Sequence, residues 1–312
     1  MKSSWSRRDF LATGLAGLAL SSLGIPGKVL GMQARGRRDI HVFSKHLQWL
    51  DYKHMAEFAA ECGFDGVDLT VRPGGHVEPQ RVTADLPLAV KAVQRTGKKV
   101  GMITTAITDA NDPHTVPILE TASRLGIGCY RTGWIEYNSD KSIEENLDDF
   151  LRRTRALAEL NRKYRIKGGY QNHAGESFGA PVWDLASVLH QVNSPWLGCQ
   201  YDIRHAIVEG ASSWRLGFDY IKRHINSLDI KDFAWKESEG RWTTENVPLG
   251  KGMVDFEAFL PLARTLPGDI PISMHYEYSL GGAEHGGKSP TLSAEEIMRL
   301  MKADLEFLRE RI

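Results

Sequence analysis

The stretch LGCQYDIRHAIVEGASSWRLGFDYIKRHINSLDI, residues 197–230, holds in one run the pattern that decides the fold. It begins with Leu197–Asp202 and ends with Ile225–Ile230, two short apolar runs whose length is typical of buried strands. Between them, Trp214–His224 carries apolar side chains at helical spacing. A strand, a helix and a second strand in this order predict a βαβ unit of a parallel sheet.

The same alternation continues on both sides of this unit. Further strands are expected at 40–44, 66–70, 100–107, 128–132, 168–172 and 270–276, and helices at 52–62, 86–96, 116–125, 142–164, 183–191, 256–265 and 293–309. Gly63 and Gly126 follow the first and third helices as left-handed caps. Eight such units predict an α/β protein with a single (β/α)8 TIM barrel at 39–312. Residues 234–251 are expected to form a long loop over one barrel face.

Motifs and composition exclude several other classes of protein. No GxGxxG follows the first strand and no P-loop occurs, which argues against dinucleotide-binding and P-loop folds. The 39 basic and 39 acidic residues balance, so nothing favours nucleic acid as a partner. A small-molecule partner is expected instead. The widely spaced Cys62, Cys129 and Cys199 are interpreted as buried thiols.

The first 34 residues differ from the rest of the chain. They contain SRRDFL at 6–11, followed by a weakly apolar run at 12–25 that is short and Gly-rich for a membrane span. This segment resembles a twin-arginine export signal. The resemblance implies a periplasmic or other extracytoplasmic location, with contact to the membrane only during export. An exported enzyme is expected to act on a free sugar or glycoside rather than on a sugar phosphate.

The ends of the expected strands carry the polar side chains. In a TIM barrel these ends meet at one mouth, where the chemistry takes place. The side chains found there are Arg72 and His76 after the second strand, Arg131 and Trp134 after the fourth, Gln171, His173 and Glu176 after the fifth, Asp202 and His205 after the sixth, Asp229 and Lys231 after the seventh, and His275 and Glu277 after the eighth. One alternative for Lys231 is a local ion pair with Asp232.

Five segments together resemble the xylose isomerase-like TIM-barrel family, also called sugar phosphate isomerase/epimerase-like. They are GFDGVDLTVRPGGHV at 63–77, YDIRHA at 201–206, LDIKDF at 228–233, PLGKGMVDF at 248–256 and HYEY at 275–278. The resemblance implies one divalent metal ion, commonly held by Glu, Asp, His and Glu on the fifth to eighth strands. These positions fall on Gln171, Asp202, Asp229 and Glu277, of which Gln171 and Asp229 depart from the family pattern. Such an oxygen-rich set favours Mn²⁺, Mg²⁺ or Co²⁺ over Zn²⁺.

The resemblance further implies a sugar isomerase or epimerase that abstracts a proton next to a carbonyl group. Glu277 or Glu176 is the expected base, His205 is expected to hold or protonate a substrate oxygen, and Lys231 is expected beside the carbonyl. The expected carbohydrate-binding residues are Arg72, His76, Arg131, Trp134, His173 and His275.

Other functions stay open at this point. One alternative is a lyase or hydratase acting on 3-keto-sugars or keto-glycosides, which would begin with the same proton abstraction. Another is a noncatalytic carbohydrate-binding barrel. The endonuclease IV branch of the same superfamily is disfavoured, because it needs a cluster of metal ions and more His and Glu ligands than these strand ends supply. The sequence does not decide whether barrels associate into a homo-oligomer.

Overall fold

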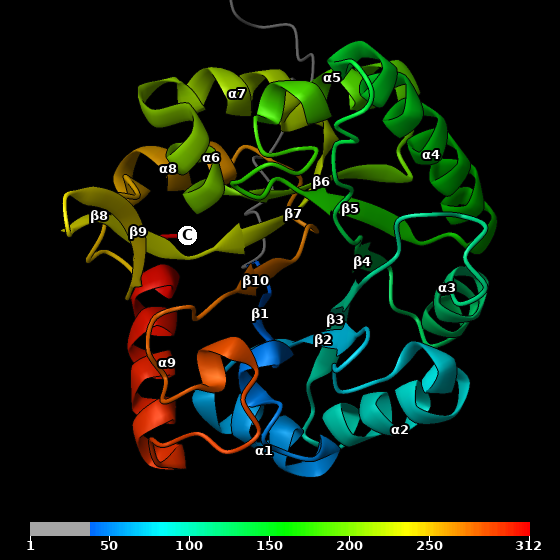
Figure 1. Ribbon diagram of the computed structural model, residues 1–312. Coiled ribbons are helices and arrows are strands. Elements are labelled where there is room, and N and C mark those ends of the chain that lie inside the picture. Colours follow the sequence, from blue (N-terminus) through cyan, green and yellow to red (C-terminus); the bar gives the residue numbers. More distant parts are fainter. Residues whose placement is uncertain (1–37) are drawn as a thin grey trace, which may run out of the picture. The chain divides into compact units, whose positions relative to one another are not determined.

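A computed structural model describes residues 38–312, so the segment interpreted as an export signal lies outside the described residues. Within the described part, eight parallel strands close into a barrel in the order β1-β10-β7-β6-β5-β4-β3-β2 (Figure 1). The barrel strands are β1 (Ile40–Phe43), β2 (Gly66–Val71), β3 (Lys99–Thr105), β4 (Cys129–Arg131), β5 (Lys167–Gln171), β6 (Leu197–Asp202), β7 (Ile225–Ile230) and β10 (Ile272–Met274). Because β1 pairs with both β2 and β10, the barrel has no open edge. The predicted (β/α)8 barrel is confirmed.

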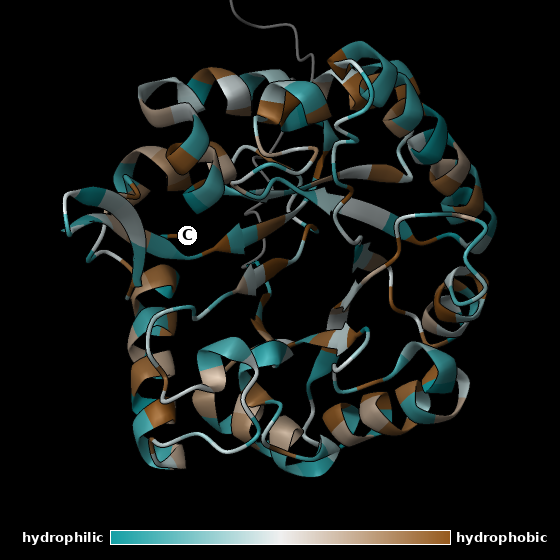
Figure 2. Cartoon of the chain, viewed as in Figure 1, coloured by the Kyte–Doolittle hydropathy of each residue, from teal (hydrophilic) through white to brown (hydrophobic). Residues whose placement is uncertain are grey.

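Helices surround the barrel and join its strands (Figure 1). They are α1 (Tyr52–Cys62), α2 (Val82–Arg95), α3 (Thr115–Arg124), α4 (Ile143–Tyr164), α5 (Val182–Val192), α6 (Ile203–Gly210), α7 (Trp214–Ile221), α8 (Phe256–Ala263) and α9 (Ala294–Arg309), with short 3₁₀ turns η1 (Ser44–Leu47), η2 (Pro79–Arg81), η3 (Ala211–Ser213), η4 (Lys222–His224) and η5 (Ala283–His285). Figure 2 shows hydrophobic and hydrophilic residues on the same helices, as expected where one face packs on the barrel. Gly63 and Gly126 have φ of 95° and 78°, which confirms both as left-handed caps.

Two local elements differ from the prediction. The expected loop at 234–251 contains an antiparallel hairpin of β8 (Asp232–Ser238) and β9 (Arg241–Val247). Its turn places Glu239 and Gly240 at φ of 53° and 75°, a conformation that glycine adopts without strain. The sequence pattern does not predict α6, which begins directly after the strand that Asp202 ends. The side chain of Asp202 caps the helix by accepting a 3.1 Å hydrogen bond from the backbone N–H of His205.

Asp232 holds the turn that contains the PLGKGMVDF motif. Its carboxylate accepts hydrogen bonds from the backbone N–H groups of Gly250, Gly252 and Val254, at 3.0, 2.9 and 3.1 Å. The side chain of Asp232 is therefore committed to this turn. The alternative of a local ion pair between Asp232 and Lys231 is wrong, because the ammonium of Lys231 contacts other carboxylates.

The cysteines lie within the packed core. Cys62, Cys129 and Cys199 are all free and buried, which confirms their interpretation as thiols. Burial raises the pKa of Cys62 and that of Cys129 to about 12, so neither is a reactive thiolate near neutral pH. Among residues 38–312, no helix has the length and apolarity required to span a bilayer.

Candidate active site

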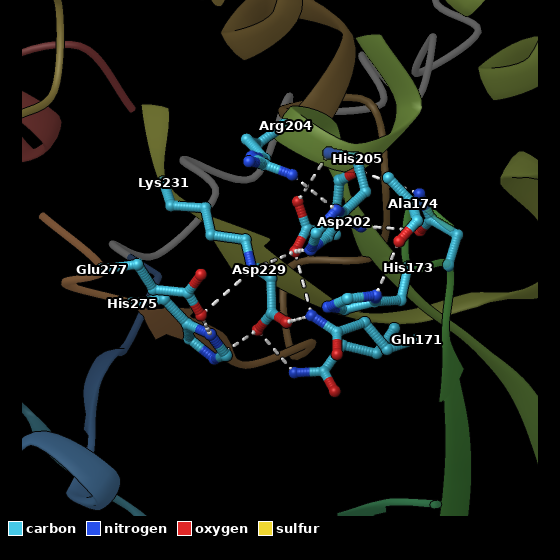
Figure 3. A network of polar contacts seen from close by, with 12 residues as sticks. Gln171, His173, Ala174, Asp202, Arg204, His205, Asp229, Lys231, His275 and Glu277 are labelled. Carbon is cyan, nitrogen blue, oxygen red and sulfur yellow. Dashed lines mark hydrogen bonds and ion pairs between the residues drawn. The ribbon is translucent and has the colours of Figure 1, made fainter. Parts of the chain in front are cut away.

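Polar side chains converge at the carboxyl ends of β5, β6 and β7 and in the segment after β10 (Figure 3). They form one contact network, here called the acid–lysine cluster, whose members are Gln171, Asp202, Asp229, Lys231, His275 and Glu277. The side chains of Asp202 and Asp229 are 0% exposed, whereas that of Glu277 is 23% exposed. Glu277 is therefore the carboxylate of this cluster that faces solvent.

Gln171, the last residue of β5, connects a guanidinium to two carboxylates. Its Oε1 accepts a 2.8 Å hydrogen bond from Arg131 Nη1. Its Nε2 donates to Asp202 Oδ2 at 2.9 Å and also to Asp229 Oδ2. The partners themselves fix this orientation of the amide, because a guanidinium only donates and a carboxylate only accepts.

Asp202 is the last residue of β6 and Asp229 the last but one of β7, and both receive donors from several directions. Besides capping α6, Asp202 lies 3.1 Å from Lys231 Nζ through its Oδ2. Asp229 Oδ1 accepts a 2.6 Å hydrogen bond from Gln200 Nε2 and lies 3.1 Å from His275 Nε2. Burial raises the pKa of Asp202, and the charge of Lys231 opposes that shift.

Lys231 follows β7 and places its ammonium between two carboxylates. Its Nζ lies 3.1 Å from Asp202 Oδ2 and 3.4 Å from Glu277 Oε1, and its side chain is 2% exposed. Burial by itself lowers the pKa of Lys231, but the charges of Asp202, Glu277 and Asp229 outweigh burial and raise it above the ordinary value. Lys231 is therefore a buried, charged ammonium.

Glu277 is held by cations on more than one side. In addition to Lys231, its Oε1 lies 3.6 Å from Lys45 Nζ and 3.7 Å from His275 Nδ1. Burial raises the pKa of Glu277, but Lys231, His275 and Lys45 outweigh burial and hold it well below the usual range. The ring of His275 stacks on Phe43 at 4.3 Å between centroids. Burial lowers the pKa of His275, yet Asp229 reverses this and the net shift is upward.

A row of rings lines the side of the mouth near β4 and β5. The guanidinium of Arg131 lies 4.5 Å from the Trp134 ring, Trp134 lies 4.6 Å from His173, and His173 lies 4.0 Å from His205. Burial lowers the pKa of His173 to about 4 and that of His205 well below 6.5. Both imidazoles are therefore neutral near physiological pH. His173 is partly exposed and His205 is buried, so His173 is the better placed to touch a ligand.

Three predicted site residues belong neither to the acid–lysine cluster nor to the row of rings. His76 is bonded within its own region, with Nε2 3.2 Å from the carbonyl oxygen of Leu47 and Nδ1 3.3 Å from Thr70 Oγ1. Glu176 is exposed in the loop after β5. Arg72 is half-buried, with its guanidinium 5.5 Å from the Phe43 ring.

Lys45 is the functional candidate that the sequence reading missed. It lies in η1, directly after β1, and its side chain is 18% exposed beside Glu277. The signal was available in the sequence, because Ser44-Lys45-His46 stands at the end of the first strand. The predicted site comes from the ends of the second and fourth to eighth strands, whereas Lys45 stands at the end of the first.

The chemistry of the donors does not fit the divalent cation that the resemblance implied. The four predicted ligands do come together, but Gln171 turns its N–H groups toward Asp202 and Asp229 and its oxygen toward Arg131. The ammonium of Lys231 contacts Asp202 and Glu277. Within residues 38–312, no three His, Cys, Asp or Glu side chains are grouped so that they could hold a metal ion.

Comparisons with known proteins agree with this fold. The sequence model of a family described as "Xylose isomerase-like TIM barrel" matches residues 56–310. A search of curated proteins gives no significant match.

Solved structures with the same fold come from several bacteria. A probable 3-DHS dehydratase, AsbF, involved in petrobactin synthesis in Bacillus anthracis, is 16% identical, with 88% of this chain and 100% of that chain covered and a TM-score of 0.65. A xylose isomerase-like TIM barrel protein from Mycobacterium smegmatis in complex with magnesium is 14% identical (88% and 100% covered, TM-score 0.62). The 3-keto-D-glucoside 4-epimerase YcjR from E. coli is 12% identical (88% and 99% covered, TM-score 0.63). At these identities the likeness shows the fold alone.

Proposed function

Because the chain belongs to the xylose isomerase-like TIM barrel family, we propose that it is a sugar isomerase or epimerase. The reaction begins with removal of a proton from a carbon next to a carbonyl group. Return of a proton to the neighbouring carbon, with transfer of the hydroxyl proton to the former carbonyl oxygen, isomerises the sugar. Return of a proton to the opposite face of the same carbon epimerises it. Similar folds carry sugar epimerase chemistry, as the name of the E. coli 3-keto-D-glucoside 4-epimerase states.

The observation that carries the proposal is the setting of Glu277. It is an ionised carboxylate that reaches solvent at the barrel mouth, and the ammonium groups of Lys231 and Lys45 lie 3.4 and 3.6 Å from it. A carboxylate in this position can accept the proton. The same cations that weaken Glu277 as a base stabilise negative charge that develops on a substrate oxygen beside them. Lys45, with 18% of its side chain exposed, is the cation that a substrate oxygen can reach.

Other groups at the mouth have roles that follow from their exposure. Trp134 and His173 are partly exposed and offer ring faces to a sugar. His205 is buried behind His173, with Nε2 3.5 Å from Asp202 Oδ2. His205 is therefore assigned to holding Asp202 and His173 in place rather than to direct contact with substrate.

Solvent exchange tests the proposed step. The full chain is incubated in D2O with a panel of ketoses, aldoses and 3-keto-glycosides, and deuterium incorporation and products are followed by NMR. Glu277→Gln keeps the shape but removes the base, so exchange is expected to fall at least about 100-fold. Glu257→Gln, an exposed residue in the first turn of α8, is the matched control and is expected to retain full exchange.

Three results would contradict this assignment. Absence of both exchange and product for every sugar would reject the enzyme and favour a carbohydrate-binding barrel, provided that sugars still bind. Full exchange by Glu277→Gln would reject Glu277 as the base. Loss of exchange in Glu176→Gln instead would transfer that role to the loop after β5.

A second candidate is a lyase or hydratase acting on 3-keto-sugars. Elimination of a substituent next to the carbanion begins with the same proton removal, and the similar structure from Bacillus anthracis is named as a probable dehydratase. The same NMR experiment separates the two reactions. Release of water or of an alcohol from the substrate indicates a lyase, whereas exchange with rearrangement of the sugar indicates an isomerase or epimerase.

A further inference from the structure

Lys231 occupies the centre of the acid–lysine cluster. Its ammonium supplies the positive charge that a bound divalent metal ion would supply in the pattern implied by the resemblance. Its ammonium touches Asp202, from β6, and Glu277, from the segment after β10 (Figure 3). In the family resemblance, the positions of these two carboxylates are those of metal ligands. The ammonium donates a hydrogen bond to Glu277 Oε1 and forms an ion pair with Asp202 Oδ2, so one oxygen of each carboxylate already has a cationic partner.

The backbone on both sides of Lys231 is fixed. Before it, the carbonyl oxygen of Ile230 accepts a 3.1 Å hydrogen bond from the backbone N–H of His275. After it, Asp232 is anchored by the backbone N–H groups of Gly250 and Gly252. The side chain of Lys231 is 2% exposed. A cation entering between Asp202 and Glu277 would therefore have to displace a buried ammonium that already contacts both carboxylates.

Gln171 supports the same conclusion from the opposite side of the cluster. A metal ligand at this position must present an oxygen, but the oxygen of Gln171 accepts from Arg131 at 2.8 Å. Its N–H groups face Asp202 and Asp229 instead. Rotating the amide to offer its oxygen would place its NH2 group against the Arg131 guanidinium, leaving two donors in contact and no acceptor.

We propose that the ammonium of Lys231 is the resident cation of this site, and that the chain binds no divalent metal ion between Asp202 and Glu277. Lys231 is thus a positioning residue that sets the places of these two carboxylates. If the chain is the enzyme proposed above, its activity is independent of divalent cations. The binding claim itself does not rest on that function, because its test needs no turnover.

Mn²⁺ is the probe, followed by the loss of its free-ion EPR signal and by isothermal titration calorimetry. Chelator-treated wild-type full chain is expected to bind no stoichiometric Mn²⁺ up to millimolar concentration. Lys231→Met keeps the length of the side chain and removes its charge, so it is expected to gain one bound Mn²⁺ per chain. Lys45→Met is the matched control. It also removes a cation beside Glu277 but leaves Lys231 in place, so it is expected to gain none.

Opposite results would overturn the proposal. One is wild-type protein that binds one equivalent of Mn²⁺ in the micromolar range and loses it in Asp202→Asn. Another is a folded Lys231→Met that gains no Mn²⁺, or a Lys45→Met that gains as much as Lys231→Met. If Lys231→Met does not fold, the wild-type titration still decides. None of these outcomes depends on sugar turnover, so failure of this proposal is distinguishable from failure of the proposed function.

Discussion

At the scale of single residues, the amide of Gln171 connects the two buried carboxylates of the site to the guanidinium of Arg131. Gln171 separates Asp202 from Asp229 and donates to both, while Arg131 donates to its oxygen. A glutamate here would retain the bond to Arg131 and turn its second oxygen toward two carboxylates. With glutamine at this position, Asp202 and Asp229 each receive a hydrogen-bond donor. With glutamate, the cluster would lose these donors and carry one more negative charge.

Gln171→Glu is expected to lower the free energy of unfolding by about 3 kcal/mol or more at neutral pH, because it places a third carboxylate against Asp202 and Asp229 in a buried site. Gln171→Leu also loses the hydrogen bonds to Asp202 and Asp229, and in addition the one from Arg131, but it adds no charge. A Gln171→Glu protein that is less stable than Gln171→Leu would therefore show the effect of charge repulsion. Urea denaturation of both proteins measures the effect. A Gln171→Glu protein as stable as the wild type would mean that the amide does not separate the carboxylates as described.

The sequence identified the residues of the site better than it identified their roles. Gln171, Asp202, Asp229 and Glu277 come together because the carboxyl ends of barrel strands share one mouth. The direction of an amide and the partner of a lysine depend on neighbours from other strands, and no local pattern encodes them. Lys231 could therefore be placed at the mouth, but its contact with Asp202 could not be foreseen.

At the scale of elements, the turn after β9 is held by one carboxylate. Asp232 accepts from the backbone N–H groups of Gly250, Gly252 and Val254, and the turn packs so closely that a Cβ on Gly252 would lie 2.2 Å from the carbonyl oxygen of Phe233. This packing explains why the PLGKGMVDF motif requires glycine at this point. The motif therefore has a structural reason that is separate from catalysis.

Asp232→Ala is expected to destabilise the protein by about 3 kcal/mol, because several buried backbone donors lose their acceptor. Hydrogen exchange should show reduced protection at Gly250, Gly252 and Val254 before other parts of the barrel. Asp232→Asn retains one acceptor oxygen and is expected to lose less. Unchanged protection at these three amides in Asp232→Ala would contradict the anchoring role.

Elements with strong periodicity were predicted well, and those set by a single side chain were not. The limits of α1, β6 and β7 match the expected ranges. The helix α6 was not predicted, because it begins where one residue, Asp202, is both the end of β6 and the N-cap of the helix. The hairpin of β8 and β9 was taken for a loop because both of its strands are mostly exposed and lack a clear apolar face.

At the scale of the whole molecule, the C-terminal helix α9 is hydrogen-bonded to the turn that follows β9. Its Asp304 is buried and accepts a 3.2 Å hydrogen bond from the backbone N–H of Leu249, which belongs to the turn anchored by Asp232. Burial raises the pKa of Asp304 from 3.8 to about 6. The folded state therefore binds a proton at this residue more tightly than the unfolded chain does.

This shift gives the stability of the molecule a pH dependence of definite sign. The contribution of Asp304 is fully present below pH 3.8 and is lost as the pH rises through about 6. Asp304→Asn is neutral throughout, so its stability relative to wild type is expected to rise by about 2 kcal/mol between about pH 4 and about pH 7. Denaturant unfolding across that range measures the difference. A constant difference, or one that falls with pH, would reject this account of Asp304.

The overall architecture was the most predictable level, because the alternation of strands and helices extends through residues 38–312 and closes as eight units. The fold is indicated by many repeated units of the sequence, whereas the reaction depends on a few side-chain contacts at the mouth. We propose two linked roles at this mouth: Glu277 removes a proton next to a carbonyl, and Lys231 supplies the central positive charge of the site.

The measurement that tests this account most directly is deuterium exchange by chelator-treated full chain in D2O, with the sugar panel and NMR detection. The account predicts that deuterium enters one carbon of the accepted sugar, at a rate that is the same with excess chelator and with added Mn²⁺, and that Glu277→Gln abolishes it. Exchange that occurs only after Mn²⁺ is added would contradict the role of Lys231. Absence of exchange with every sugar under both conditions would contradict the proposed reaction.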